Sequence, residues 1–132
     1  KQSYKKMASS SSFKYFIPLL HHSVILFTQQ ATIIKSDLFF ELEGFDEKYK
    51  LAADTKLWAQ LSLKNLKYKY ISKECAVYTL QNGQLSSNHE IGTIEHQRLL
   101  QEFPIKKYKT IIPLLIYRIK NIPIYLYRIF NL

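Results

Sequence analysis

An aspartate at the predicted start of a helix is the residue in this sequence best placed to do chemistry. Asp54 lies near the beginning of residues 52–65 (AADTKLWAQLSLKN), where Leu57, Trp58 and Leu61 recur at helical spacing. A carboxylate in that position is held rigidly and can point into a cleft, where it could accept a proton from a hydroxyl group. It could instead serve only to stabilise the helix dipole. The residue pattern alone favours this second role.

Other residue types that could do chemistry lack suitable spacing. His21 and His22 are adjacent, so their side chains point in different directions on a helix or a strand and predict no shared metal site. The single cysteine, Cys75, excludes an internal disulfide and a zinc site built from several thiolates, and it favours a reducing compartment. Phosphate-binding glycine loops, HExxH and GxSxG are also absent from the sequence.

The elements that must position these residues alternate between strands and helices. Residues 28–35, 67–72 and 75–80 are rich in β-branched and aromatic residues and predict strands. A short helix is expected at 37–42, with Ser36 as its N-cap and Gly44 at its end. Further helices are expected at the ranges 52–65, 91–102 and 112–130, the last interrupted by Pro113 and Pro123.

Charge is unevenly distributed along the 132 residues, which carry a net charge of +9. With 47% hydrophobic and 22% charged residues, the composition is that of one globular domain or a piece of one. All acidic residues lie between Asp37 and Glu102, so a nearly neutral body is flanked by two basic ends. Basic ends suit an anionic partner such as lipid headgroups or phosphates. Solubility alone is the alternative explanation.

The basic C-terminal segment, residues 106–132, also carries an apolar stripe. Its apolar residues fall mostly three or four positions apart, at 112, 115, 116, 119, 122, 126, 129 and 130. Together with basic residues off the stripe and interleaved tyrosines, this pattern is typical of a helix lying on an anionic membrane. Packing of the stripe on the rest of the protein remains open as a second interpretation. Residues 16–27 are apolar, but their two histidines and the lack of a cleavage site argue against a signal peptide.

Six segments in order carry a resemblance to a known family over about residues 28–104. They are 30–35 (QATIIK), 38–39 (LF), 43–47 (EGFDE), 52–58 (AADTKLW), 67–71 (KYKYI) and 82–86 (NGQLS). This order resembles the C-terminal, acceptor-side half of family-2 glycosyltransferases with the GT-A fold. The GFDE segment followed by an aspartate that heads an LW helix is the most specific part.

The resemblance implies an α/β fold: a partial GT-A-like region over 1–104 with a basic amphipathic helical tail over 105–132. It also implies inverting transfer of a sugar from a nucleotide-sugar donor to a glycan or lipid-linked acceptor, with Asp54 as catalytic base. Trp58 is expected in the core rather than on a sugar. The substrate-binding residues implied are Gln30, Asp46, Glu47, Gly83 and Ser86.

Several family features are missing from this sequence. The donor-binding half and its D-x-D motif are not present, so a divalent metal (Mg or Mn) is expected only in a full-length enzyme and none on this chain alone. Ala53 and Lys56 replace two usual acids, and Gln60 replaces a usual arginine. Gln29 replaces a usual histidine, and Asn82 replaces one of two usual glycines. We therefore expect a fragment or a split gene product with no measurable transfer by itself.

A second function class stays open beside the transferase. A small non-enzymatic module could use the same basic ends to bind an anionic membrane or nucleic acid. Basic residues are dispersed and form no recognised nucleic-acid motif, so no nucleic-acid partner is expected. We expect the protein in the cytoplasm, peripheral to the inner face of the plasma membrane, with residues 106–132 as the contact with the anionic membrane surface.

Overall fold

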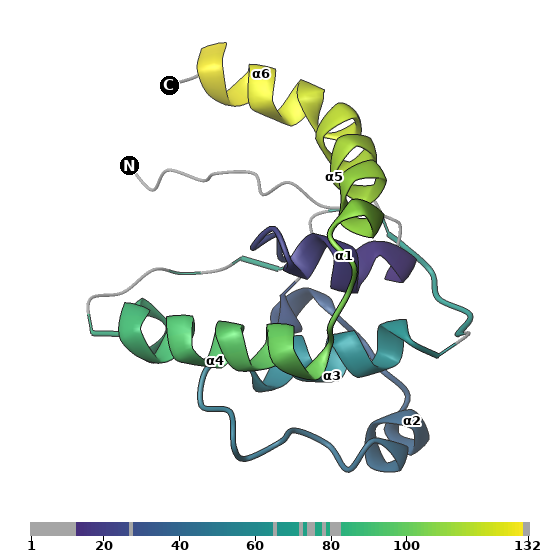
Figure 1. The fold of residues 1–132 in the computed structure, drawn as a ribbon, viewed down its shortest axis with the longest axis vertical. Helices are drawn as coiled ribbons and strands as arrows, with labels where there is room; N and C mark the ends of the chain where they lie inside the picture. Colours follow the sequence, from purple (N-terminus) through teal and green to yellow (C-terminus); the bar gives the residue numbers. More distant parts are fainter. Residues whose placement is uncertain are drawn as a thin grey trace. The chain divides into compact units, whose positions relative to one another are not determined.

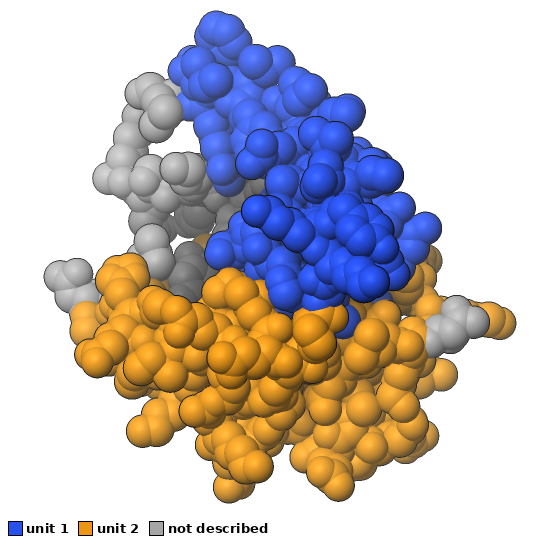
Figure 2. Space-filling model, viewed as in Figure 1, with its two compact units in different colours: residues 1–26, 105–132 blue, residues 27–104 orange. Residues whose placement is uncertain are grey.

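The computed structural model describes residues 13–26, 28–64, 66–71, 73, 76–77, 79 and 83–130. The chain forms two compact units (Figure 2). Unit 1 contains residues 1–26 and 105–132, and unit 2 contains residues 27–104.

Every regular element in the described ranges is helical, so the α/β prediction is wrong (Figure 1). No strand occurs at the described parts of 28–35, 67–72 or 75–80. Gln29–Ala31 instead forms the 3-10 helix η2, and Thr32 and Lys35 have extended backbone without strand pairing. A β-branched segment becomes a strand only when a neighbour satisfies its backbone groups. Ile33 is 98% exposed, so this segment is not covered as a buried strand would be.

Unit 2 is built around two longer helices, α3 (Ala53–Ser62) and α4 (His89–Glu102). The buried side chains of α3 follow the spacing predicted from sequence, because Leu57, Trp58 and Leu61 are all nearly inaccessible to solvent. Asn88 caps α4 by accepting a hydrogen bond from the backbone N–H of Ile91 at 3.1 Å. The short elements are α2 (Ser36–Glu41), η2 (Gln29–Ala31) and η3 (Leu85–Ser87).

The end of α2 positions the segment that leads toward α3. Helix α2 begins at Ser36, one residue earlier than predicted, with Lys35 rather than Ser36 in the capping position. Gly44 donates its N–H to the carbonyl of Phe39, and Glu43 donates to Phe40, which is the paired bonding of a Schellman motif. Both Glu43 and Gly44 have positive φ, so the chain reverses sharply here.

Unit 1 consists of η1 (Phe13–Tyr15), α1 (Phe16–Leu20), α5 (Tyr108–Lys120) and α6 (Ile122–Phe130). Helix α1 packs against α5, and its Phe16, Leu19 and Leu20 are fully buried. Of the two prolines expected to interrupt the C-terminal helix, Pro113 lies within the continuous α5. The break comes after Lys120, and Pro123 sits in the first turn of α6, where its missing N–H costs nothing.

Candidate functional site

The residues before Asp54 are held by a buried carboxylate from α4. Glu95 is 4% exposed, and its side chain accepts three backbone N–H bonds. Lys50 donates to Oε1 at 2.6 Å, while Leu51 and Ala52 both donate to Oε2 at 2.9 Å. Burial by itself would raise the pKa of Glu95, but these three hydrogen bonds outweigh it and the pKa is lowered. The entrance to α3 is therefore fixed by a charged group from a distant helix.

A second polar cluster ties the GFDE segment to α3 and α4. Lys56 Nζ pairs with Asp46 Oδ2 and also with Glu102 Oε2, the latter at 2.9 Å. The Tyr49 hydroxyl donates to Glu102 Oε1 at 2.7 Å. Asp46 Oδ1 in turn accepts the backbone N–H of Lys48 at 2.9 Å. Both carboxylate oxygens of Asp46 are thus engaged within the chain.

The ionisation of this cluster follows from its contacts. The hydrogen bond from Lys56 is the main reason that the pKa of Asp46 is lowered. Burial would lower the pKa of Lys56, but its hydrogen bonds to Asp46 and Glu102 outweigh that effect and raise it. Burial, together with the bond to Glu102, raises the pKa of the Tyr49 phenol. The cluster therefore stays charged at neutral pH, with Tyr49 protonated.

Asp54 lies in the first turn of α3, as predicted, and its side chain is half-buried. Its Oδ1 accepts hydrogen bonds from the N–H and hydroxyl of Thr55, at 2.6 and 3.2 Å. Within the described ranges, its Oδ2 has no hydrogen-bond partner and neither oxygen pairs with a cation. Asp46 and Glu95, the other described carboxylates that are at least half-buried, both have their oxygens occupied by hydrogen-bond donors. Asp54 is thus oriented through one oxygen and available through the other.

The remaining predicted site residues lie in exposed segments. Glu47 is exposed in the loop after Gly44, and Gln30 is exposed within η2 rather than on a strand. Gly83 has φ of +75° in an exposed turn, and Ser86 is exposed within η3. Among the six predicted residues, Asp46 and Asp54 lie in segments that are joined through Lys56, whose ammonium group pairs with Asp46.

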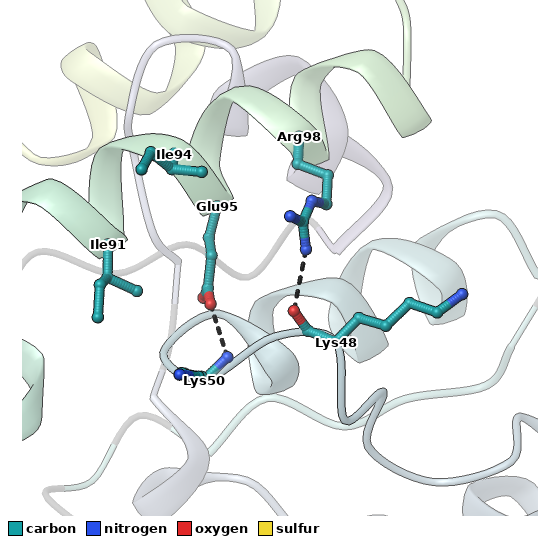
Figure 3. A pocket seen from close by; sticks show the side chains of 6 residues that line it. All are labelled: Lys48, Lys50, Ile91, Ile94, Glu95 and Arg98. Atoms are coloured by element: carbon teal, nitrogen blue, oxygen red, sulfur yellow. Dashed lines mark hydrogen bonds between the residues drawn. The ribbon is translucent and has the colours of Figure 1, made fainter.

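An open hollow lies between α4 and the loop that contains Lys48 and Lys50 (Figure 3). It has a volume of about 200 Å³ and is lined by Lys48, Lys50, Ile91, Ile94, Glu95 and Arg98. Figure 3 shows Glu95 and Arg98 reaching from α4 to the loop, where Arg98 donates to the carbonyl of Lys48 at 2.9 Å. Asp54 is not among the lining residues.

The acidic residues do not fit the divalent metal of a full-length transferase. In the part of the chain that the structure describes, no three His, Cys, Asp or Glu side chains come together as ligands. Asp46 and Glu102 already share Lys56, so their oxygens face a cation of the chain itself. No chemical step is therefore assigned to a metal on these residues.

The sequence interpretation missed the residues that hold this site together. Glu95, Arg98 and Glu102 recur at positions i, i+3 and i+7 of α4, so they share one helix face. That spacing is visible in the sequence and indicates a charged helix face that contacts another part of the chain. Its partners were not visible, because they are backbone groups, Lys56 and Tyr49.

Comparison with known proteins adds no relative: no family model matches the chain, and neither curated proteins nor solved structures give a match. None of the helices in the described ranges is long and apolar enough to cross a membrane.

Proposed function

We propose that this chain supplies the acceptor side of an inverting sugar transferase, with Asp54 as the catalytic base. One observation carries the proposal: Asp54 is a half-buried carboxylate, oriented by Thr55 through Oδ1, whose Oδ2 has no partner among the described residues. The sequence of residues 28–104, which resembles the acceptor side of family-2 glycosyltransferases, supports the same assignment.

The arrangement suits proton transfer because its surroundings are rigid. Glu95 holds the three residues before α3 in place. Lys56, which follows Asp54 by two residues, holds the GFDE segment through Asp46. A base must be held in place to act at the moment of attack, since misplacement by about 1 Å can cost about a hundredfold in rate. Asp46 and Glu95 serve here as positioning residues, because their oxygens are already occupied.

In the proposed reaction, Asp54 Oδ2 accepts the proton of an acceptor hydroxyl. The hydroxyl oxygen forms a bond to the anomeric carbon of a nucleotide-sugar while the bond from that carbon to the diphosphate breaks. The nucleoside diphosphate leaves with the bonding electrons, and the anomeric configuration inverts. Donor binding requires residues outside this chain. We place the reaction at the cytoplasmic face of the plasma membrane, where glycan acceptors are carried on lipid.

Asp54→Asn tests the assignment, because it keeps the shape of the side chain and removes the base. Transfer of labelled sugar from UDP-, GDP- and dTDP-sugars is measured in membranes of the cells that make this polypeptide, after the chromosomal copy is replaced by the variant. Loss of a general base predicts a fall of about a hundredfold or more in rate.

Asp37→Asn is the matched control, since Asp37 is an exposed first-turn aspartate of α2. It should leave transfer unchanged. Full activity of Asp54→Asn, or an equal loss in both variants with normal protein levels, would contradict the role of Asp54. If the wild-type membranes transfer none of the three sugars in a manner that depends on this gene, the transferase proposal itself is wrong.

A further inference from the structure

Helix α5 turns an unexpected face toward the rest of its unit. Its buried residues are Thr110, Pro113 and Tyr117, followed by Asn121 directly after the helix. Thr110 shares a side-chain hydrogen bond with His22, just beyond α1, with 2.8 Å between Oγ1 and Nε2. Asn121 Nδ2 donates to the carbonyl of Tyr117 at 2.8 Å. The side of α5 that packs is therefore its polar and aromatic side.

The apolar stripe lies on the opposite side and is exposed. We define the apolar face as the stripe residues that are each between 47 and 80% exposed: Ile112, Leu115, Ile119, Ile122, Leu126, Ile129 and Phe130. It runs along α5 and continues on α6. Of the two interpretations that the sequence left open, packing within the protein does not account for these seven side chains.

Basic residues border the apolar face on α5. Because successive residues of an α-helix are rotated by about 100°, Lys109 and Lys120 follow one edge of the face and Arg118 follows the other. All three are exposed. No acidic residue occurs after Glu102 in the sequence. A long aliphatic row between basic edges, with no negative charge nearby, is complementary to lipid chains beneath anionic headgroups.

We infer that the apolar face is a membrane-docking surface that inserts into the interface of an anionic bilayer. Helices α5 and α6 lie along the membrane plane, with the side that packs on α1 turned away from lipid. The lysine and arginine stems lie along the apolar row and place their charges at the phosphates. Tyr108 and Tyr127, which are 63 and 57% exposed, lie at headgroup level, where amphipathic rings are favoured. The inference does not depend on sugar transfer.

Flotation of the full chain with lipid vesicles tests the inference. One set of vesicles is phosphatidylcholine alone, and the other is an equal mixture with phosphatidylglycerol. The wild-type chain should float with the mixed vesicles and much less with the neutral ones, and added salt should release it. Ile112→Ser with Ile119→Ser should lower the partition coefficient at least about tenfold. Lys109→Gln with Lys120→Gln should lower it severalfold on the mixed vesicles only.

Unit 2 provides matched controls. Ile33→Ser removes an isoleucine that is 98% exposed, and Lys67→Gln with Lys69→Gln removes two exposed charges. These variants should bind like the wild type. No binding of the wild type, equal binding to both vesicle types, or normal binding of the Ile112/Ile119 variant would overturn the inference. A stable dimer in solution that the Ile112/Ile119 variant dissociates, without vesicle binding, would show that a second copy covers the face instead.

Discussion

Glu95 connects α4 to the backbone at the entrance of α3, and so acts on Asp54 without touching it. Its carboxylate satisfies three backbone N–H groups that would otherwise need other acceptors. An amide in its place offers one acceptor oxygen and turns an N–H₂ group toward the remaining donors. The residue is therefore more important for the position of the site than its distance from Asp54 in the sequence suggests.

Glu95→Gln should lower the free energy of unfolding of the chain by about 2 kcal/mol, the cost of leaving buried donors unsatisfied. Urea unfolding followed by the fluorescence of Trp58, which is buried in α3, measures the change. Glu90→Gln is the control, because Glu90 is an exposed residue in the first turn of the same helix. An equal, small effect of both substitutions would show that the three hydrogen bonds contribute little.

The sequence predicted the position of Asp54 in the first turn of its helix, but not the contacts around it. Its first-turn position follows from local spacing, because Leu57, Trp58 and Leu61 determine which side of α3 is buried. The partners of Glu95 are backbone N–H groups, which every residue except proline carries, so no residue type identifies them. Long-range pairs such as Lys56 with Glu102 likewise depend on tertiary packing.

The turn after α2 orients the segment that contains Asp46. Gly44 has φ of +73°, and a Cβ placed there would lie 3.1 Å from Phe39 Cζ. A side chain at this position would meet both an unfavourable backbone conformation and a crowded ring. Gly92, by contrast, lies within α4, where an added Cβ would be 3.9 Å from Leu51 Cδ1, an ordinary contact.

Alanine substitutions of the two glycines should therefore change the free energy of unfolding in opposite directions. Gly44→Ala should lower the free energy of unfolding by about 1 to 2 kcal/mol, and Gly92→Ala should raise it by about 0.5 to 1 kcal/mol. Thermal unfolding followed by circular dichroism compares the two alanine variants with the wild type. Destabilisation by both substitutions would contradict the described geometry of α4, and stabilisation by both would contradict that of the turn.

The helices were predictable because their signals are local, whereas the strands were not. Apolar spacing located α3, the helix predicted over 91–102 covers most of α4, and Gly44 marked the end of α2. A strand depends on a partner elsewhere, so β-branched residues such as Ile33 and Ile34 indicate only an extended backbone. The extended conformation of Thr32 is what those residues favour without a neighbouring strand.

The acidic residues are distributed unevenly between the two units of the molecule. All acidic residues belong to unit 2, and the apolar face belongs to unit 1, whose sequence contains bases and no acids. The sequence showed this asymmetry directly, since charge is additive along the chain. It did not show which side of α5 packs, because Thr110 and Asn121 owe their burial to contacts of α1 and the helix junction.

The anomeric configuration of the product tests the central claim most directly. A single carboxylate base at Asp54 allows only one displacement at the anomeric carbon, so a donor of α configuration should give a β-linked product. The first-formed product of the membrane reaction is isolated, and the coupling constant of its anomeric proton is read by NMR. Inversion agrees with Asp54 as the base. Retention would require a covalent or paired mechanism that this site does not supply, and it would contradict the account.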